Sequence, residues 1–106
     1  MISMTRIKHF SQRSAREFKP KRIILFGSYA EGSPTQDSDV DMLVVMPFEG
    51  RSVEKSVEIR MKLLPDFPLD LLVRTPENIE QRLSMVDFFM HGIIHKGKVL
   101  YEIHNP

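Results

Sequence analysis

Two stretches, Leu25-Phe26-Gly27-Ser28 and Ser38-Asp39-Val40-Asp41, decide the fold of this chain. The first ends an apolar run with a glycine and a serine. The second places two aspartates at the entrance to another apolar run, Met42-Leu43-Val44-Val45. Short branched apolar runs bounded by turn residues are typical of buried strands. The pattern therefore predicts a strand, a turn, a pair of acids and a second strand.

A third aspartate, Asp70, lies inside a further apolar run, Leu69-Asp70-Leu71-Leu72-Val73. A carboxylate within an apolar strand costs free energy unless something offsets it. Asp39 and Asp41 are two residues apart, so in a strand they point to one face, where their charges repel unless a proton or a cation intervenes. Mg²⁺ is the simplest such cation, because it takes one or two carboxylates together with water and phosphates. With Asp70 on a neighbouring strand, the acids predict a site for one or two metal ions that serves phosphoryl transfer.

The glycine and serine suit a phosphate-binding turn. Gly27 has no Cβ, so the backbone can approach a ligand closely there. Ser28 opens a predicted helical turn, and exposed N–H groups at a helix start bind phosphate oxygens. We therefore expect this turn to hold a triphosphate and Asp39 and Asp41 to hold its metal ion. Asp70 is then free to help deprotonate an acceptor hydroxyl.

Apolar periodicity and the prolines and glycines divide the rest of the chain. The predicted elements are helix 5–18, strand 22–26, a helical turn at 28–31, strand 40–46, helix 52–64, strand 69–73, a helix from Pro76 that Gly92 ends, and a short strand at 99–101. Residues 93–101 fit either a hairpin or a loop that leads into one edge strand. This order predicts an α/β or α+β domain, with a small mixed sheet flanked by helices.

Two apolar stripes mark the expected faces of the longer helices. They are Val53, Val57, Met61 and Leu64 in the first helix, and Ile79, Leu83, Val86 and Met90 in the second. Tyr29 follows the phosphate-binding turn and fits either a ring that stacks on a base or a surface aromatic. Phe88 and Phe89 fit core packing better than a partner contact, although one of them could face a partner.

Composition limits the classes of function. The chain has 106 residues, which predicts a single domain over 1–106. A net charge of +1 gives no support to nucleic-acid binding by electrostatics. The absence of cysteine excludes disulfides and thiolate metal sites. No apolar run approaches the length of a membrane span and no signal-peptide pattern is present, so we expect a cytoplasmic protein without membrane contact.

The motif Gly27-Ser28, ten residues, then Asp39-Val40-Asp41, resembles the defining motif of the DNA polymerase β-like nucleotidyltransferase superfamily. The segment Leu69-Asp70-Leu71 is similar to its third acidic element. The size and the tail at 97–102 resemble minimal nucleotidyltransferase (MNT) domains. The resemblance implies a polymerase β-like core that transfers AMP from ATP with Mg²⁺. It makes Asp39 and Asp41 metal ligands and Asp70 a third ligand or base.

Many small MNT proteins are antitoxins that are encoded beside a HEPN-domain RNase toxin. The resemblance therefore implies the antitoxin of a type VII toxin–antitoxin pair. Such a protein binds the HEPN toxin and attaches AMP to a hydroxyl of it, on a tyrosine near its active site. One departure is Glu31, where relatives often have a basic residue. It removes no metal ligand, but it changes the charge beside the phosphate-binding turn.

Three alternatives stay open on the sequence. A small-molecule nucleotidyltransferase of the aminoglycoside-modifying kind shares this core but carries additional helices to hold its acceptor. The 106 residues leave no room for them, so such an activity would need a partner subunit or a dimer. A non-catalytic antitoxin neutralises the toxin by binding alone, and the retention of all three acids argues against it. A structural calcium domain is the third, but the acids are too far apart along the chain for an EF-hand loop.

Overall fold

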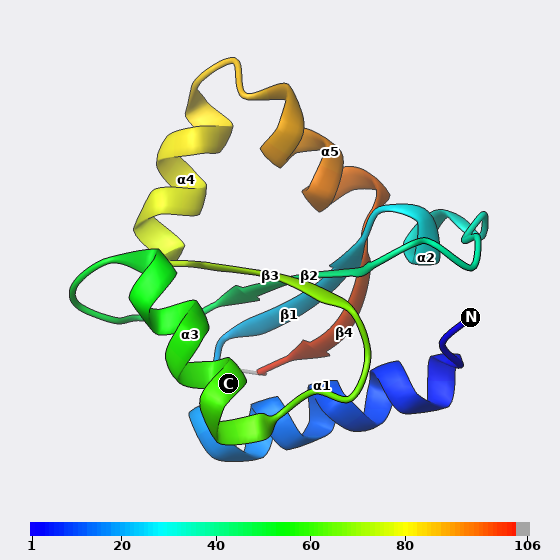
Figure 1. Cartoon of the computed structure of the whole chain (residues 1–106). Helices are drawn as coiled ribbons and strands as arrows, with labels where there is room; N and C mark the ends of the chain where they lie inside the picture. The colour runs from blue at the N-terminus through cyan, green and yellow to red at the C-terminus, as the bar shows by residue number, and fades with distance from the viewer. Residues whose placement is uncertain (104–106) are drawn as a thin grey trace.

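A four-stranded sheet with the order β3-β2-β1-β4 forms the centre of the molecule (Figure 1). The structure is a computed structural model, and it describes residues 1–103. The central strand β1 (Arg22–Phe26) runs antiparallel to β2 (Val40–Val45) and to β4 (Lys98–Glu102). Strand β3 (Leu69–Arg74) pairs with β2 in parallel. The sheet is therefore mixed, as predicted, and β3 forms one of its edges.

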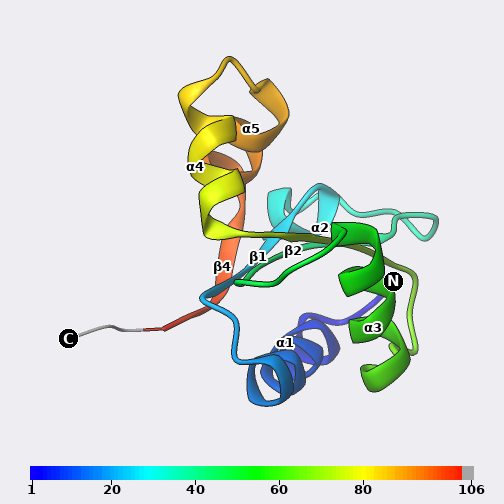
Figure 2. The same ribbon diagram turned by 90° about the vertical axis from the view of Figure 1, so that its left-hand side faces the viewer.

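Helices cover both faces of this sheet (Figure 2). On one face lie α1 (Met4–Phe18) and α3 (Ser52–Leu63), and on the other lie α4 (Pro76–Ser84) and α5 (Phe88–Lys96). Alternate residues of each strand point to opposite faces, and they divide the core into two clusters. The larger cluster packs Val40 and Met42 against α1 and α3, and the smaller one packs Leu43 and Val45 against α4 and α5.

Local capping explains where several helices begin and end. The Ser3 side chain accepts a hydrogen bond from the Arg6 backbone N–H at the start of α1. Thr75 caps α4 in the same way, with Pro76 at the first helical position, as the sequence predicted. Lys19 ends α1 in a left-handed conformation with φ of 49°, directly before Pro20.

The predicted apolar face of α3 is wrong. Val53, Val57, Met61 and Leu64 are all exposed, between 52% and 70%. The buried side chains of α3 are instead Ile59 and Leu63. The reason lies in polar anchors on the inward side, because Ser56 donates a hydrogen bond to the carbonyl of Leu71 and Arg60 donates one to the carbonyl of Leu69. These bonds fix the rotation of α3 on β3 and leave the stripe in solvent.

The predicted single helix after Pro76 is also wrong. Helix α4 ends at Ser84, and Met85 adopts an extended conformation. Asp87 then begins α5, because its Oδ1 accepts a hydrogen bond of 2.9 Å from the Met90 N–H. Gly92 lies within α5 rather than at its end. Residues 93–96 are therefore helical, which excludes the hairpin and leaves β4 as one edge strand.

Among the described residues, no helix is both long and apolar enough to span a membrane.

Candidate active site

Asp41 and Asp70 occupy matching positions on the two parallel strands. They are register partners between β2 and β3. Asp41 alternates with Val40 and Met42, which face α1 and α3, so its side chain lies on the opposite face, beneath α4 and α5. Asp70 alternates with Leu69 and Leu71 in the same way. The sheet therefore brings these two carboxylates side by side on one face, about 5 Å apart at the backbone.

Asp39 stands directly before β2 rather than within it. The connection that leads to it is tightened by Thr35, whose N–H donates to the Ser38 hydroxyl and whose carbonyl accepts from the Ser38 N–H, at 2.9 and 3.1 Å. The Val40 N–H then donates to the Pro68 carbonyl and joins this strand entrance to that of β3. The three predicted acids are thus delivered to one end of the β2–β3 pair.

The electrostatics of Asp41 reflect this gathering of charge. Partial burial raises the pKa of Asp41 above its usual value, and the carboxylates of Asp70 and then Asp39 raise it further. An ionised Asp41 is therefore disfavoured unless a positive charge lies beside it. This observation fits a cation at Asp41, and Mg²⁺ needs only one or two carboxylates of the protein.

The side chains themselves do not form a closed cage. Within residues 1–103, no group of three or more His, Cys, Asp or Glu side chains is close enough to hold a metal ion. Asp39 and Asp70 are exposed, whereas Asp41 is half-buried. The geometry therefore suits an open site, in which one or two carboxylates share an ion with a ligand, better than an ion held by the protein alone.

Gly27 brings the backbone against Asp41. Its φ is +72°, and a Cβ built on it would overlap the Oδ2 atom of Asp41. The short helix α2 (Ser28–Glu31) follows at once, with the N–H groups of Ala30 and Glu31 donating to the Gly27 carbonyl at 3.0 and 3.1 Å. The predicted turn at Gly27 and Ser28 is thus directly beside the acids.

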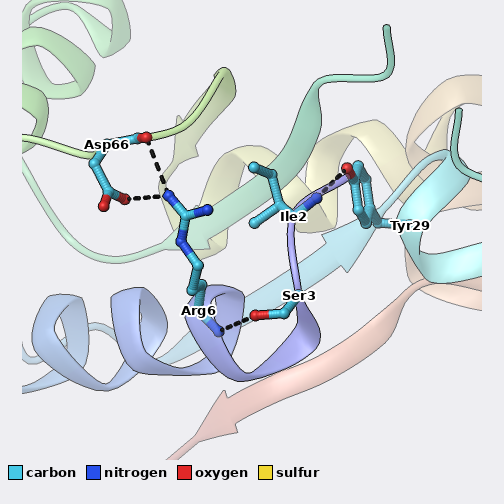
Figure 3. Close-up of polar contacts among 5 residues, drawn as sticks. All are labelled: Ile2, Ser3, Arg6, Tyr29 and Asp66. Carbon is cyan, nitrogen blue, oxygen red and sulfur yellow. Dashed lines mark hydrogen bonds and ion pairs between the residues drawn. The ribbon is translucent and has the colours of Figure 1, made fainter. Parts of the chain in front are cut away.

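The far side of α2 is anchored in the larger core cluster. Tyr29 is buried, and its hydroxyl accepts a hydrogen bond of 3.0 Å from the Ile2 N–H (Figure 3). Tyr29 is therefore neither a surface aromatic nor a ring available to a base. Its role is to position the turn.

The Arg6 guanidinium, on α1, pairs with Asp66 at 3.0 Å and holds the pKa of that exposed carboxyl below its usual value.

A cavity of about 280 Å³ adjoins the turn. Its walls come from the end of β1, from α2 and from one side of α5, and they include Phe26, Gly27, Phe88, Phe89 and Lys96. Because Phe26 is the register partner of Asp41, the cavity continues the row formed by Asp70 and Asp41. Sequence reasoning did not find this cavity. The sequence feature that could have indicated it is the pair Phe88-Phe89, directly after Asp87.

Residues 7–95 match the family described as "Nucleotidyltransferase domain". Two proteins of Methanocaldococcus jannaschii are similar in sequence. The one named "Putative protein adenylyltransferase MJ0604" is 32% identical over 83 residues, which are 76% of this chain and 78% of that protein. The one named "Putative protein adenylyltransferase MJ1305" is 34% identical over 91 residues, which are 78% of this chain and 59% of that protein. The chain therefore belongs to the nucleotidyltransferase domain family.

Solved structures share the fold. A Sulfolobus solfataricus protein described as a "putative nucleotidyltransferase" superimposes with a TM-score of 0.64 at 16% identity, over 92% of this chain and 78% of that one. A chain of a toxin–antitoxin complex crystallised with AMP-PNP gives a TM-score of 0.64 at 24% identity, over 91% of this chain and 73% of that one. At these identities the likeness shows the fold. The predicted fold class and the predicted nucleotidyltransferase family are both confirmed.

Proposed function

We propose that this protein transfers AMP from ATP to a hydroxyl of a partner protein, with Mg²⁺, and that it acts as the antitoxin of a toxin–antitoxin pair. The observation that carries this proposal is the row formed by Gly27, Asp41 and Asp70. A close-approach glycine, a carboxylate with a raised pKa and a second, exposed carboxylate in register lie together on one face of the sheet.

The metal ligands in this proposal are Asp39, Asp41 and Asp70. The crowding of negative charge at Asp41 fits such a role, and the open geometry leaves room for phosphate oxygens in the same coordination shell. When bound, Mg²⁺ supplies positive charge that offsets the charge of the phosphates as the leaving group departs.

Other groups of the chain bind the triphosphate and accept the proton of the acceptor hydroxyl. The turn at Gly27 and Ser28 holds the triphosphate, because the glycine lets the backbone lie against the acids. Asp70 lies exposed on the edge strand β3 and accepts the proton of the acceptor hydroxyl. The hydroxyl oxygen then forms a bond to the α-phosphorus. The bond from that phosphorus to the bridging oxygen breaks, and pyrophosphate leaves.

The acceptor in this proposal is a tyrosine of a HEPN-domain RNase toxin, and residues 1–106 are a single MNT domain. Three points support a protein acceptor. Two relatives are named "Putative protein adenylyltransferase", one structural neighbour comes from a toxin–antitoxin complex, and Asp70 lies exposed on the edge strand. A cytoplasmic location is part of the same proposal, because ATP and the toxin would have to be present in one compartment.

One observation favours a second candidate, an antitoxin that neutralises its toxin by binding alone. The acids of the described residues do not converge on one ion position. A protein of this kind would form the complex but leave the partner unmodified.

Purified protein tests both candidates. The wild-type protein is incubated with the product of the neighbouring gene, ATP and Mg²⁺, and pyrophosphate release is followed together with the mass of the partner. We expect one or more AMP groups on the partner, and their loss in Asp41→Asn. Asp37→Asn, which changes an exposed aspartate of the same loop, is the matched control and retains transfer. A stable complex without any modification of the partner would support the binding-only antitoxin.

A further inference from the structure

We propose that the cavity beside Gly27 holds the base of the donor nucleotide by stacking, and that it does not recognise the hydrogen-bonding edge of that base. This inference rests on the proposed function, and it extends that function to the choice of nucleotide. The cavity, its aromatic walls and its place in the row of acids carry it.

The place of the cavity assigns it to the donor rather than the acceptor. The strand order puts Asp70 on the edge strand β3, Asp41 on β2 and Phe26 on β1. Asp70 receives the acceptor, so the acceptor approaches from the β3 edge. The cavity begins at Phe26 and Gly27, on the opposite side of Asp41. A group bound there belongs to the molecule whose phosphates lie at the Gly27 turn.

The walls of the cavity suit a planar ring and do not suit phosphate. Phe26 and Phe89 meet edge to face, with ring centroids 5.9 Å apart and planes at 87°. Gly92 and Ile93 of α5 complete this side. An aromatic wall binds the face of any base, and each such stack contributes about 1–3 kcal/mol. Phosphate oxygens, in contrast, would lose their hydration and gain only the Lys96 ammonium from the lining side chains, beside the Glu31 carboxylate that repels them.

The size of the cavity agrees with one ring system. Its volume of about 280 Å³ is below the range of about 300–1,000 Å³ for pockets that enclose a whole small molecule. The side chains of Phe88 and Phe89 are 83% and 60% exposed. Exposed aromatic surface beside the proposed reaction site is typical of a ligand-binding or interaction surface.

The polar groups of the cavity predict weak selection among bases. Among the described residues that line it, Glu31 and Lys96 carry the polar side chains, and both are exposed on flexible stems. Strong rejection of a wrong base needs fixed, buried hydrogen-bonding groups, whereas apolar pockets discriminate by only about 10- to 200-fold. We therefore expect the affinities for ATP and GTP to differ by less than about 200-fold. CTP binds more weakly, because a pyrimidine offers less stacking surface.

Titration calorimetry with Mg²⁺ tests this inference, with ATP, GTP, CTP and inorganic tripolyphosphate as the probes. We expect Phe89→Ala to weaken the binding of ATP and GTP by about 5- to 140-fold and to leave the binding of tripolyphosphate unchanged, because tripolyphosphate has no base. Phe89→Tyr keeps the aromatic face and retains the affinity for ATP. Val53→Ala, at an exposed apolar position of α3, is the control and changes nothing. Circular dichroism confirms that each variant is folded.

Three results would overturn the inference. They are an equal loss of ATP and tripolyphosphate affinity in Phe89→Ala, an unchanged ATP affinity in that variant, and a preference of ATP over GTP above about 200-fold. None of these results contradicts the proposed function. The proposed function is contradicted by a different result, in which nucleotides bind as expected but no nucleotidyl group is transferred to a protein partner.

Discussion

Gly27 and Asp41 are in such close contact that no side chain fits between them. A Cβ at Gly27 would overlap the Oδ2 atom of Asp41, and the φ of +72° at Gly27 already disfavours any other residue. The end of β1 and the start of β2 are therefore joined at the point where the proposed phosphate turn meets the proposed metal ligands. Backbone conformation and site geometry impose the same requirement here.

A comparison of substitutions at Gly27 and Gly50 separates the effect of backbone strain from the effect on the site. We expect Gly27→Ala to lower the free energy of unfolding by about 1–3 kcal/mol through backbone strain and to abolish AMP transfer by displacing Asp41. Gly50 is the matched control, because its φ is +88° but a Cβ there meets nothing within 4 Å. Gly50→Ala should show similar strain in urea denaturation while retaining transfer. Equal activity in the two variants would contradict the role of Gly27.

The raised pKa of Asp41 predicts a pH-dependent gain in stability for Asp41→Asn. The raised pKa of Asp41 in the folded state means that folding favours its protonated carboxyl. The stabilising contribution of the protonated carboxyl is present below pH 3.8, and it is lost as the pH rises through the raised pKa of the folded state. In EDTA at pH 7, Asp41→Asn should therefore unfold at a higher urea concentration than wild type. The difference should fade below pH 3.8. A variant that is less stable than wild type at pH 7 would contradict the crowding of charge.

Leu63 and Leu64 test the orientation of α3. They are adjacent residues of the same type, but Leu63 is 2% exposed and Leu64 is 70% exposed. We expect Leu63→Ala to lower the free energy of unfolding by about 2–5 kcal/mol, and Leu64→Ala to change it by less than about 0.5 kcal/mol. Chemical denaturation measures both. A larger loss of stability in Leu64→Ala than in Leu63→Ala would instead support the buried face that the sequence alone predicted.

Asp87 tests the division between α4 and α5. Its carboxylate accepts from the Met90 N–H, so Asp87→Ala should lower the free energy of unfolding by about 0.5–2 kcal/mol. Asp87→Ser keeps a capping oxygen and should lose much less. If the two variants were equally destabilised, the lost contact would be the ion pair of Asp87 with Arg82 at 3.8 Å rather than the cap.

Much of this architecture could be predicted from the sequence, because short strands of branched residues between glycine, proline and polar segments have few alternatives. The bounds of β1 and α2 match the predicted ones, and those of β2 and β3 differ by one residue. The sequence placed Asp70 on a strand beside the one that Asp41 enters, and the structure makes the two residues register partners. The family match then confirmed the resemblance to nucleotidyltransferases that Gly27, Asp39 and Asp41 carry.

The errors lie where long-range contacts override local periodicity. In α3, Ser56 and Arg60 donate hydrogen bonds to β3, and these bonds decide which side of the helix faces the sheet. The spacing of apolar residues along the helix does not reveal such bonds. At Asp87 a capping carboxylate interrupts a stripe that continues through it in the sequence. The cavity depends on Phe26 meeting Phe89, which are far apart along the chain, so only the folded structure brings it into view.

The most direct test of the proposed transfer is the intact mass of the neighbouring gene product after co-expression with this protein. We predict a mass increase that corresponds to one or more AMP groups on a tyrosine. It should be absent with Asp39→Asn, a variant that forms the same complex, and present with the control Asp37→Asn. An unmodified partner with the wild-type protein, or a partner modified equally by Asp39→Asn, would contradict the assignment of these acids to AMP transfer.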